Sequence, residues 1–192
     1  HVLAKRVRGW INAAGLVSPP DRGSLAGFPH GPPAVWDFVA NAGDGRTVQV
    51  QMTATMAQGR NTTVFCFQRP SQGKASGKQL PESASVHLVV RVDIEDRSFH
   101  SETHRNGGSD HHFSWHSKPL NGNEKKGAPA GFAFTPAADR QLRVYSEAGR
   151  YHHQGEWSEN IQHPVEQTRG QVGAGDAVSP GWFEIPLPKG AT

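Results

Sequence analysis

Histidine is the residue whose spacing in this chain suggests chemistry most directly. Of the 11 histidines, seven lie between residues 100 and 153: His100, His104, His111, His112, His116, His152 and His153. Imidazoles at such spacings can bind zinc or another transition metal. However, no Cys or compact carboxylate completes a recognised ligand pattern, and the first two of these histidines flank loop-like sequence. We therefore expect solvated or hydrogen-bonded histidines and no metal cofactor, with a metal-dependent jelly-roll protein as an alternative.

Carboxylates are the second group that could do chemistry, because paired Asp or Glu side chains act as general acid and base. Five of them lie in the C-terminal part of the chain: Glu156, Glu159, Glu166, Asp176 and Glu184. Glu166 and Arg169 are three residues apart, so they can meet on a turn as an ion pair and pin the loop before the final strand. We expect this pair to be structural, and we expect no catalytic residue within this chain.

The composition favours many short strands over long helices, because the chain holds 22 Gly and 14 Pro. The net charge is +3, and the densest basic cluster (Lys5, Arg6 and Arg8) is too small to predict a nucleic-acid partner. The single cysteine, Cys66, cannot form an internal disulfide, and its apolar neighbours predict a small core residue. No apolar stretch reaches the ~20 residues of a membrane span and no signal peptide is recognisable. We expect a cytoplasmic protein without a membrane partner.

Hydrophobic alternation indicates where strands form. Apolar and polar residues alternate from Arg46 to Met56, which predicts a half-buried strand. Residues 61–68 follow as its partner, and apolar side chains on both faces predict that this strand is central. Residues 86–94 form the clearest strand, with a continuous apolar face. Shorter strands are predicted at residues 113–115, 131–134, 141–145, 150–153 and 182–187.

Residues 1–34 differ from the rest because two Pro pairs and several glycines interrupt regular structure. We expect an irregular lead-in there, with room for a short helical turn in residues 2–11. Residues 107–110 are interpreted as a flexible turn, since no helix signal follows them. Many short strands without βαβ alternation predict an all-β fold, an antiparallel β-sandwich over residues 35–192.

A block in the last third of the chain resembles a known family. It reads WSENIQHPVEQTRG from Trp157 to Gly170 and DAVSPGWF from Asp176 to Phe183. It resembles the N-terminal domain of bacterial and archaeal glycogen-debranching (amylo-α-1,6-glucosidase) enzymes, where a Trp-Tyr-x-Asn-Phe run precedes Glu-x-x-Arg-Gly and Ser-Pro-Gly-x-Phe. Upstream, VVRVD (89–93) and RSFHS (97–101) resemble a strand and an Arg-x-Phe-His segment of that domain. The resemblance covers residues 45–192, and Gly175 stands where the family pattern has an acidic residue.

The resemblance implies a supersandwich (galactose-mutarotase-like) fold that serves as an accessory domain. In the family the hydrolytic acids belong to a following helical toroid. The implied partners are therefore a C-terminal (α/α) catalytic domain of the same polypeptide and an α-glucan. Hydrolysis of α-1,6 branch points, which needs two carboxyls about 5 to 9.5 Å apart across the sugar, would be the activity of the parent enzyme. A free-standing carbohydrate-binding β-sandwich module is the alternative from a different class.

Aromatic rings suit sugar binding, because a flat ring covers the apolar face of a pyranose while polar groups bind its hydroxyls. Trp115, Trp157 and Trp182 are the aromatic candidates, and core packing is the competing role for each. Trp157 has polar neighbours on both sides and looks least like a core residue, whereas Phe183 has a better claim to the core than Trp182. We expect the substrate-binding residues to be Trp157, Asn160, Arg169, Trp182, Arg97 and His100.

Overall fold

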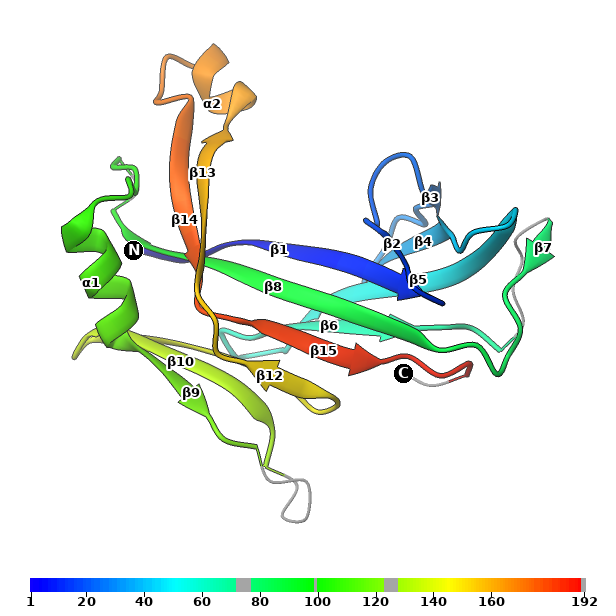
Figure 1. The fold of residues 1–192 in the computed structure, drawn as a ribbon. Coiled ribbons are helices and arrows are strands. Elements are labelled where there is room, and N and C mark those ends of the chain that lie inside the picture. Colours follow the sequence, from blue (N-terminus) through cyan, green and yellow to red (C-terminus); the bar gives the residue numbers. More distant parts are fainter. Residues whose placement is uncertain (72–76, 99, 123–127, 191–192) are drawn as a thin grey trace. The chain divides into compact units, whose positions relative to one another are not determined.

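The computed structural model describes residues 1–71, 77–98, 100–122 and 128–190. The chain forms two compact units (Figure 1): unit 1 holds residues 1–8 and 90–184, and unit 2 holds residues 9–89 and 185–192. Three strands contribute residues to both units, namely β1 (Val2–Ala13), β8 (Val86–Arg97) and β15 (Trp182–Pro186). In the described part of the chain, no helix is long and apolar enough to cross a membrane.

Unit 1 contains a small antiparallel sheet of order β11-β10-β9 and a second set of antiparallel strands next to β8. The small sheet consists of β9 (Ser117–Leu120), β10 (Ala130–Ala137) and β11 (Arg140–Ser146). The second set adds β12 (Arg150–His152), which pairs with β15, and β13 (Glu156–Gln162) and β14 (Ala174–Ser179), which pair with each other. Helix α1 (Gly107–His116) precedes β9, and the short α2 (Pro164–Thr168) connects β13 to β14.

The core of unit 1 lies between these two layers. Its buried side chains are Val92 and Ile94 of β8, Phe113 of α1, Phe132 and Phe134 of β10, and Val178 of β14. Val92 and Ile94 on β8, and Phe132 and Phe134 on β10, are each two residues apart, so each pair faces the same side of its strand. The predicted all-β antiparallel sandwich is therefore confirmed.

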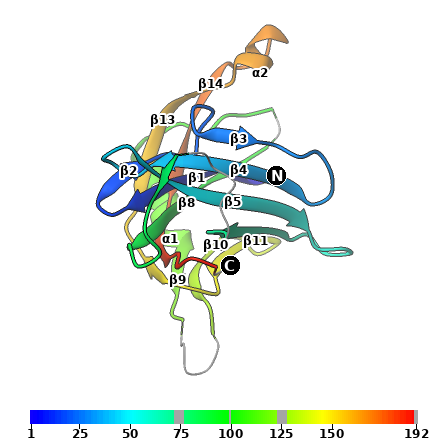
Figure 2. The ribbon, with the colours of Figure 1, turned by 90° about the vertical axis from the view of Figure 1, so that its right-hand side faces the viewer.

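Unit 2 is built on an antiparallel sheet of order β3-β4-β5-β6, which Figure 2 shows in part. The strands of this sheet are β3 (Leu25–Gly27), β4 (Ala34–Asn41), β5 (Arg46–Met56) and β6 (Thr63–Gln68), and β7 (Lys78–Gln79) pairs with β5 in parallel. Strand β2 (Leu16–Ser18) also belongs to this unit but pairs with β1. A tight turn joins β4 to β5, since Gly43, Asp44 and Gly45 all have positive φ and Asn41 Oδ1 accepts a hydrogen bond from the Gly43 amide. Phe38 and Val50 are among the side chains buried in this unit.

The basic cluster near the start of the chain pairs with acidic residues of the neighbouring strand. Strand β1 lies next to β8. Arg6 Nε lies 2.6 Å and Arg8 Nη2 2.9 Å from the two oxygens of Asp93, and Lys5 Nζ lies 2.7 Å from Glu95 Oε1. The side chains of Asp93 and Glu95 have no solvent exposure. These cations therefore neutralise buried carboxylates, and they are not a free basic surface.

Several predicted strands are confirmed, but the prediction for residues 1–34 is wrong. Strand β5 has the predicted bounds, and β8 extends the predicted strand by three residues, to Arg97. Residues 2–11 form part of β1 instead of a helical turn, and β2 and β3 follow. The hydrogen-bond ladder to a long neighbouring strand outweighs the weak helical periodicity of this segment. The division of the chain at residue 34 stays a prediction.

Four further predictions are wrong. Strand β6 ends its sheet and is largely exposed, and Cys66 is an exposed thiol instead of a core residue. Residues 113–115 belong to helix α1, and the glycine-rich segment before them is its first turn. Asn106 starts this helix with a capping box, which compensates for the poor helix propensity of the two glycines.

Candidate functional site

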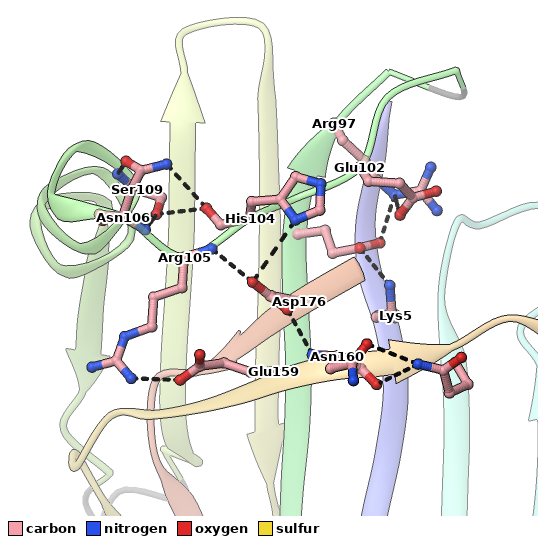
Figure 3. Close-up of polar contacts among 12 residues, drawn as sticks. Lys5, Arg97, Glu102, His104, Arg105, Asn106, Ser109, Glu159, Asn160 and Asp176 are labelled. Atoms are coloured by element: carbon pink, nitrogen blue, oxygen red, sulfur yellow. Dashed lines mark hydrogen bonds and ion pairs between the residues drawn. The ribbon is translucent and has the colours of Figure 1, made fainter. Parts of the chain in front are cut away.

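An open polar hollow of about 400 Å³ lies in unit 1 beside α1. Three stretches of chain form it: the end of β8, residues 101–106, and the first half of α1. Its lining residues are Asp96, Arg97, Ser101, Glu102, Thr103, His104, Asn106, Gly108, Ser109, His112 and Phe113. Most of these carry polar side chains, so the hollow suits a ligand that forms hydrogen bonds. Figure 3 shows part of its polar network.

Reciprocal hydrogen bonds fix the segment before α1. Asn106 Oδ1 accepts from the Ser109 amide at 3.0 Å, and Ser109 Oγ accepts from the Asn106 amide at 2.8 Å. Ser109 Oγ also donates to the carbonyl of His104 at 2.9 Å. The capping box therefore holds His104 and Asn106 against the start of the helix (Figure 3).

Asp176 joins this segment to the β13–β14 hairpin. Its carboxylate accepts hydrogen bonds from the amides of Arg105 at 2.8 Å and Asn160 at 2.7 Å, and its own amide donates to the Thr103 carbonyl at 2.7 Å. Asn160 has a φ of 55°, and the pairing of β13 with β14 shifts register around it, as in a β-bulge. Burial raises the pKa of Asp176, but the two amide bonds, with the charges of His104 and Lys5, outweigh burial and lower it.

This lowered pKa makes the stability contributed by Asp176 depend on pH. The folded state favours the ionised form, so its contribution is complete above the ordinary carboxyl pKa of about 4 and is lost as the pH falls through the lower folded pKa. Asp176→Asn keeps an acceptor oxygen but not the charge. We expect it to lower the free energy of unfolding at pH 7 by about 1 kcal/mol.

Urea denaturation between pH 7 and pH 2 measures this effect. The gap between wild type and Asp176→Asn should close below pH 4, whereas Asp44→Asn, whose side chain is 84% exposed, should change little at any pH. A gap that stays constant down to pH 2 would contradict the role of the charge.

Arg97 and Glu102 form the wall of the hollow nearest to β8. Arg97 Nε lies 2.9 Å from Glu95 Oε2, and its Nη1 donates to the Ser101 carbonyl at 3.0 Å. Arg97 Nε is 3.8 Å from Glu102 Oε2, too far for a hydrogen bond. This Glu102 oxygen is buried and accepts no hydrogen bond from any residue that the structure describes.

Gly175 lies directly against the Glu102 carboxylate. A Cβ atom on Gly175 would lie 2.6 Å from Glu102 Oε2, closer than such atoms approach in proteins. The family pattern implied an acidic residue at position 175. In this chain no side chain fits at position 175 unless Glu102 moves. The Glu102 carboxylate therefore lies where a side chain of residue 175 would otherwise be.

The histidines on α1 have protein partners. His112 Nε2 lies 3.1 Å from Asp96 Oδ2, and Asp96 also pairs with Arg140 at 3.0 Å. His116 Nδ1 lies 2.8 Å from the Thr135 carbonyl. Among the described residues, no group of three or more His, Cys, Asp or Glu side chains is placed to hold a metal ion. This geometry does not support the metal-dependent alternative.

Trp157 is half-buried and packs against the core of unit 1. It packs edge-on against Phe113, with ring centroids 5.6 Å apart, and its indole nitrogen donates to Asp110 Oδ1. The expectation that Trp157 is the least core-like tryptophan is therefore wrong, because α1 covers the ring. Trp115 is the exposed one: its side chain stacks on His111 and lies under the Lys118 ammonium group.

The other predicted binding residues lie in different parts of unit 1. Arg97 lines the hollow, and His100 follows it along the chain. Asn160 sits in the β13 bulge, where its Oδ1 accepts a hydrogen bond from Gln162. Helix α2 lies at the tip of the β13–β14 hairpin (Figure 1), and Arg169 follows it as the C-cap. Trp182, the first residue of β15, stacks on His152. These residues do not form one cluster.

Two predictions about neighbouring residues are confirmed. Phe183 is buried, and Trp182 beside it is only half-buried. Arg169 Nη1 lies 3.9 Å from Glu166 Oε1, so this pair meets on the turn as expected.

All five candidate carboxylates have structural partners. Glu156 pairs with Arg8 and Arg91, Glu159 with Arg105, Glu166 with Arg169, and Glu184 with His152, while Asp176 binds the two amides described above. Sequence reasoning missed Glu102. Gly175, which has no side chain, is the only sign of Glu102 in the sequence. This sign can be interpreted only when the structure shows that the two residues are in contact.

These observations define an antiparallel β-sandwich protein. It has a polar hollow, and its candidate carboxylates form ion pairs or hydrogen bonds with other residues of the protein. The chain belongs to the family described as the N-terminal domain of glycogen debranching enzyme, which matches residues 12–192. Neither the comparison with curated proteins nor the comparison with solved structures gave a match.

Proposed function

We propose that this chain is the accessory N-terminal domain of a glycogen-debranching-type glycoside hydrolase. In this proposal it supports a C-terminal (α/α) catalytic domain of the same polypeptide and helps that domain to bind α-glucan near α-1,6 branches. The family match over residues 12–192 is the observation that carries the proposal. The described residues form two β-rich units, which agrees with an N-terminal β-sandwich domain.

The state of the carboxylates supports a non-catalytic role. A glycosidase needs a general acid with a raised pKa and a second carboxyl across the sugar. Asp176 has a lowered pKa, the opposite of what a general acid requires. Glu156 and Glu159 each form an ion pair with an arginine of the same unit. The hydrolytic acids are therefore assigned to the catalytic domain.

The polar hollow supports contact with glucan. Sugar hydroxyls both donate and accept hydrogen bonds, and Arg97, Glu102 and His104 offer complementary groups along its wall. Of the residues predicted from the sequence to bind substrate, Arg97 lines the hollow and is the one that we assign to sugar contact, whereas His100 is not among the lining residues. In this proposal Trp157 and Asn160 stabilise unit 1 and do not contact the sugar, because both form hydrogen bonds within the unit.

We expect this chain alone to release no glucose from a branched limit dextrin, measured with a coupled glucose assay. Glu166→Gln should leave that result unchanged, because Glu166 pairs with Arg169 on an exposed turn. A glucose release that is lost on Glu166→Gln would place catalysis in this chain and would overturn the accessory role.

A further inference from the structure

We infer that a small cavity in unit 2 binds one monatomic anion of the size of chloride, which supplies the counter-charge of the buried Arg69 guanidinium. The cavity lies between four stretches of chain: the start of β5, the two residues after β6, the end of β7 with Leu80, and the C-terminal segment at Lys189. None of the described residues that line it is Asp or Glu. Such a site lies in unit 2 and involves no glucan, so it does not depend on the proposed function.

The first observation is that Arg69 is buried without a negatively charged partner. Arg69 is only 3% exposed, and its Nη1 and Nη2 atoms donate to the carbonyls of Ala84 at 3.1 Å and Pro81 at 2.9 Å. These carbonyls carry no net charge, and Arg69 forms no ion pair with a carboxylate in the described part of the chain. A charged side chain is rarely buried unless an opposite charge neutralises it. An anion that enters the cavity would do so.

The second observation is the charge balance around Arg69. Glu82 acts on Arg69 from a distance, but its carboxylate is 77% exposed and lies 2.6 Å from Lys189 Nζ. Burial lowers the pKa of Arg69, and the charge of Glu82 offsets this effect only in part. Two cations and one carboxylate leave one positive charge beside the cavity. An anion is therefore favoured there over a water molecule, which carries no charge.

The third observation is a buried hydroxyl on the wall of a very small cavity. The cavity measures about 10 Å³, which holds roughly one water-sized sphere. Thr47 lines it, and Thr47 Oγ1 is buried without a hydrogen-bond partner among the described residues. A hydroxyl donates to an anion, and a hydrogen bond to a charged group is stronger than one between neutral groups. A phosphate or sulfate, with four oxygens around a central atom, is too large, so the ligand class is a halide ion.

An anion at this position would hold several segments of unit 2 together. The Gly190 amide donates to the Arg69 carbonyl at 2.7 Å, and the Leu80 amide donates to the Thr47 carbonyl at 2.8 Å. The Arg69 guanidinium in turn binds the carbonyls of residues 81 and 84. A ligand that binds the folded chain and not the unfolded chain raises the stability of the fold. We therefore expect chloride to stabilise the protein.

The test is thermal unfolding of the whole chain while chloride replaces gluconate at constant ionic strength, so that the screening of surface charges stays the same. We expect the unfolding temperature of the wild type to rise with the chloride concentration. Arg69→Gln, which removes the charge, should abolish this rise. Thr47→Val, which replaces the hydroxyl by a methyl group, should require about tenfold more chloride for the same rise. Arg22→Gln, at an exposed arginine of the same unit, should respond like the wild type.

Two results would overturn the site. An unfolding temperature of the wild type that does not depend on chloride would exclude halide binding. An equal rise in the wild type and in Arg69→Gln would show that chloride acts elsewhere on the chain, as an adventitious ion only. If Arg69→Gln shows no cooperative unfolding, Thr47→Val decides, and a response equal to that of the wild type would then overturn the site. None of these results bears on the glucose assay above, which tests the proposed function separately.

Discussion

Asp93→Ala is expected to lower the free energy of unfolding by about 3 kcal/mol. The Asp93 side chain has no solvent exposure, and its two oxygens bind Arg6 and Arg8 at 2.6 and 2.9 Å. Removing it takes from Arg6 the carboxylate that binds it, while Arg8 keeps its ion pair with Glu156. Breaking a buried ion pair from one side costs about 3–5 kcal/mol, and the lower end applies because Arg6 is 39% exposed and can turn toward water.

Chemical denaturation at pH 7, analysed by linear extrapolation, measures this loss. Asp139→Ala is the matched control, since that carboxylate also pairs with an arginine, Arg140, but is 75% exposed. It should cost well under 1 kcal/mol. Equal costs for the two substitutions would show that burial of the pair does not matter, and our interpretation of the β1–β8 contact would be wrong.

Phe134→Ala is expected to lower the free energy of unfolding by about 3–5 kcal/mol. Phe134 has no solvent exposure and stacks on Phe113 of α1 with ring centroids 5.4 Å apart. Its loss opens a cavity between the small sheet and the helix, and a close-packed core collapses only partly around such a cavity.

Tyr145→Ala on the same sheet is the control for Phe134→Ala, because Tyr145 is 54% exposed. It should cost less than about 1 kcal/mol. Thermal or chemical unfolding of both variants gives the comparison. A loss below 1 kcal/mol for Phe134→Ala would mean that α1 does not pack on this sheet as the structure shows.

The strands that could be predicted from the sequence are those with one clearly apolar face. Strand β5 alternates between apolar and polar residues, and burial alternates along β8 from Val86 to Val92, as expected for a strand with one face in the core. Strand β6 also has apolar side chains, but its neighbours determine whether they are covered, and the sequence does not show the order of strands in a sheet. For this reason its central position and the burial of Cys66 were predicted incorrectly.

Helix α1 was missed because its local signals conflict. Gly107 and Gly108 are poor helix formers, and they hide the start of the helix. Asn106 followed three residues later by Ser109 is the signal that could have revealed it, because the two form a capping box. For the basic cluster Lys5, Arg6 and Arg8, the sequence shows the positive charges but not their partners, because Asp93 and Glu95 lie 85–90 residues later in the chain.

The candidate site could be predicted only in part. Arg97 was found through its place in a family-like segment, and it does line the hollow. Glu102 and Asp176 act through contacts that join distant segments, such as Asp176 with the amides of Arg105 and Asn160. Spacing along the chain carries no information about such contacts. Trp157 shows the same limit, because the helix that covers its ring lies more than 40 residues earlier.

We propose that this domain binds α-glucan without hydrolysing it. Affinity electrophoresis of the whole chain in gels with glycogen, and in gels with a β-linked glucan as the control, tests it most directly. We predict retardation by glycogen, no retardation by the β-linked glucan, and no glucose released from the glycogen during the run. Equal mobility in both gels, or glucose released from the glycogen, would contradict the account.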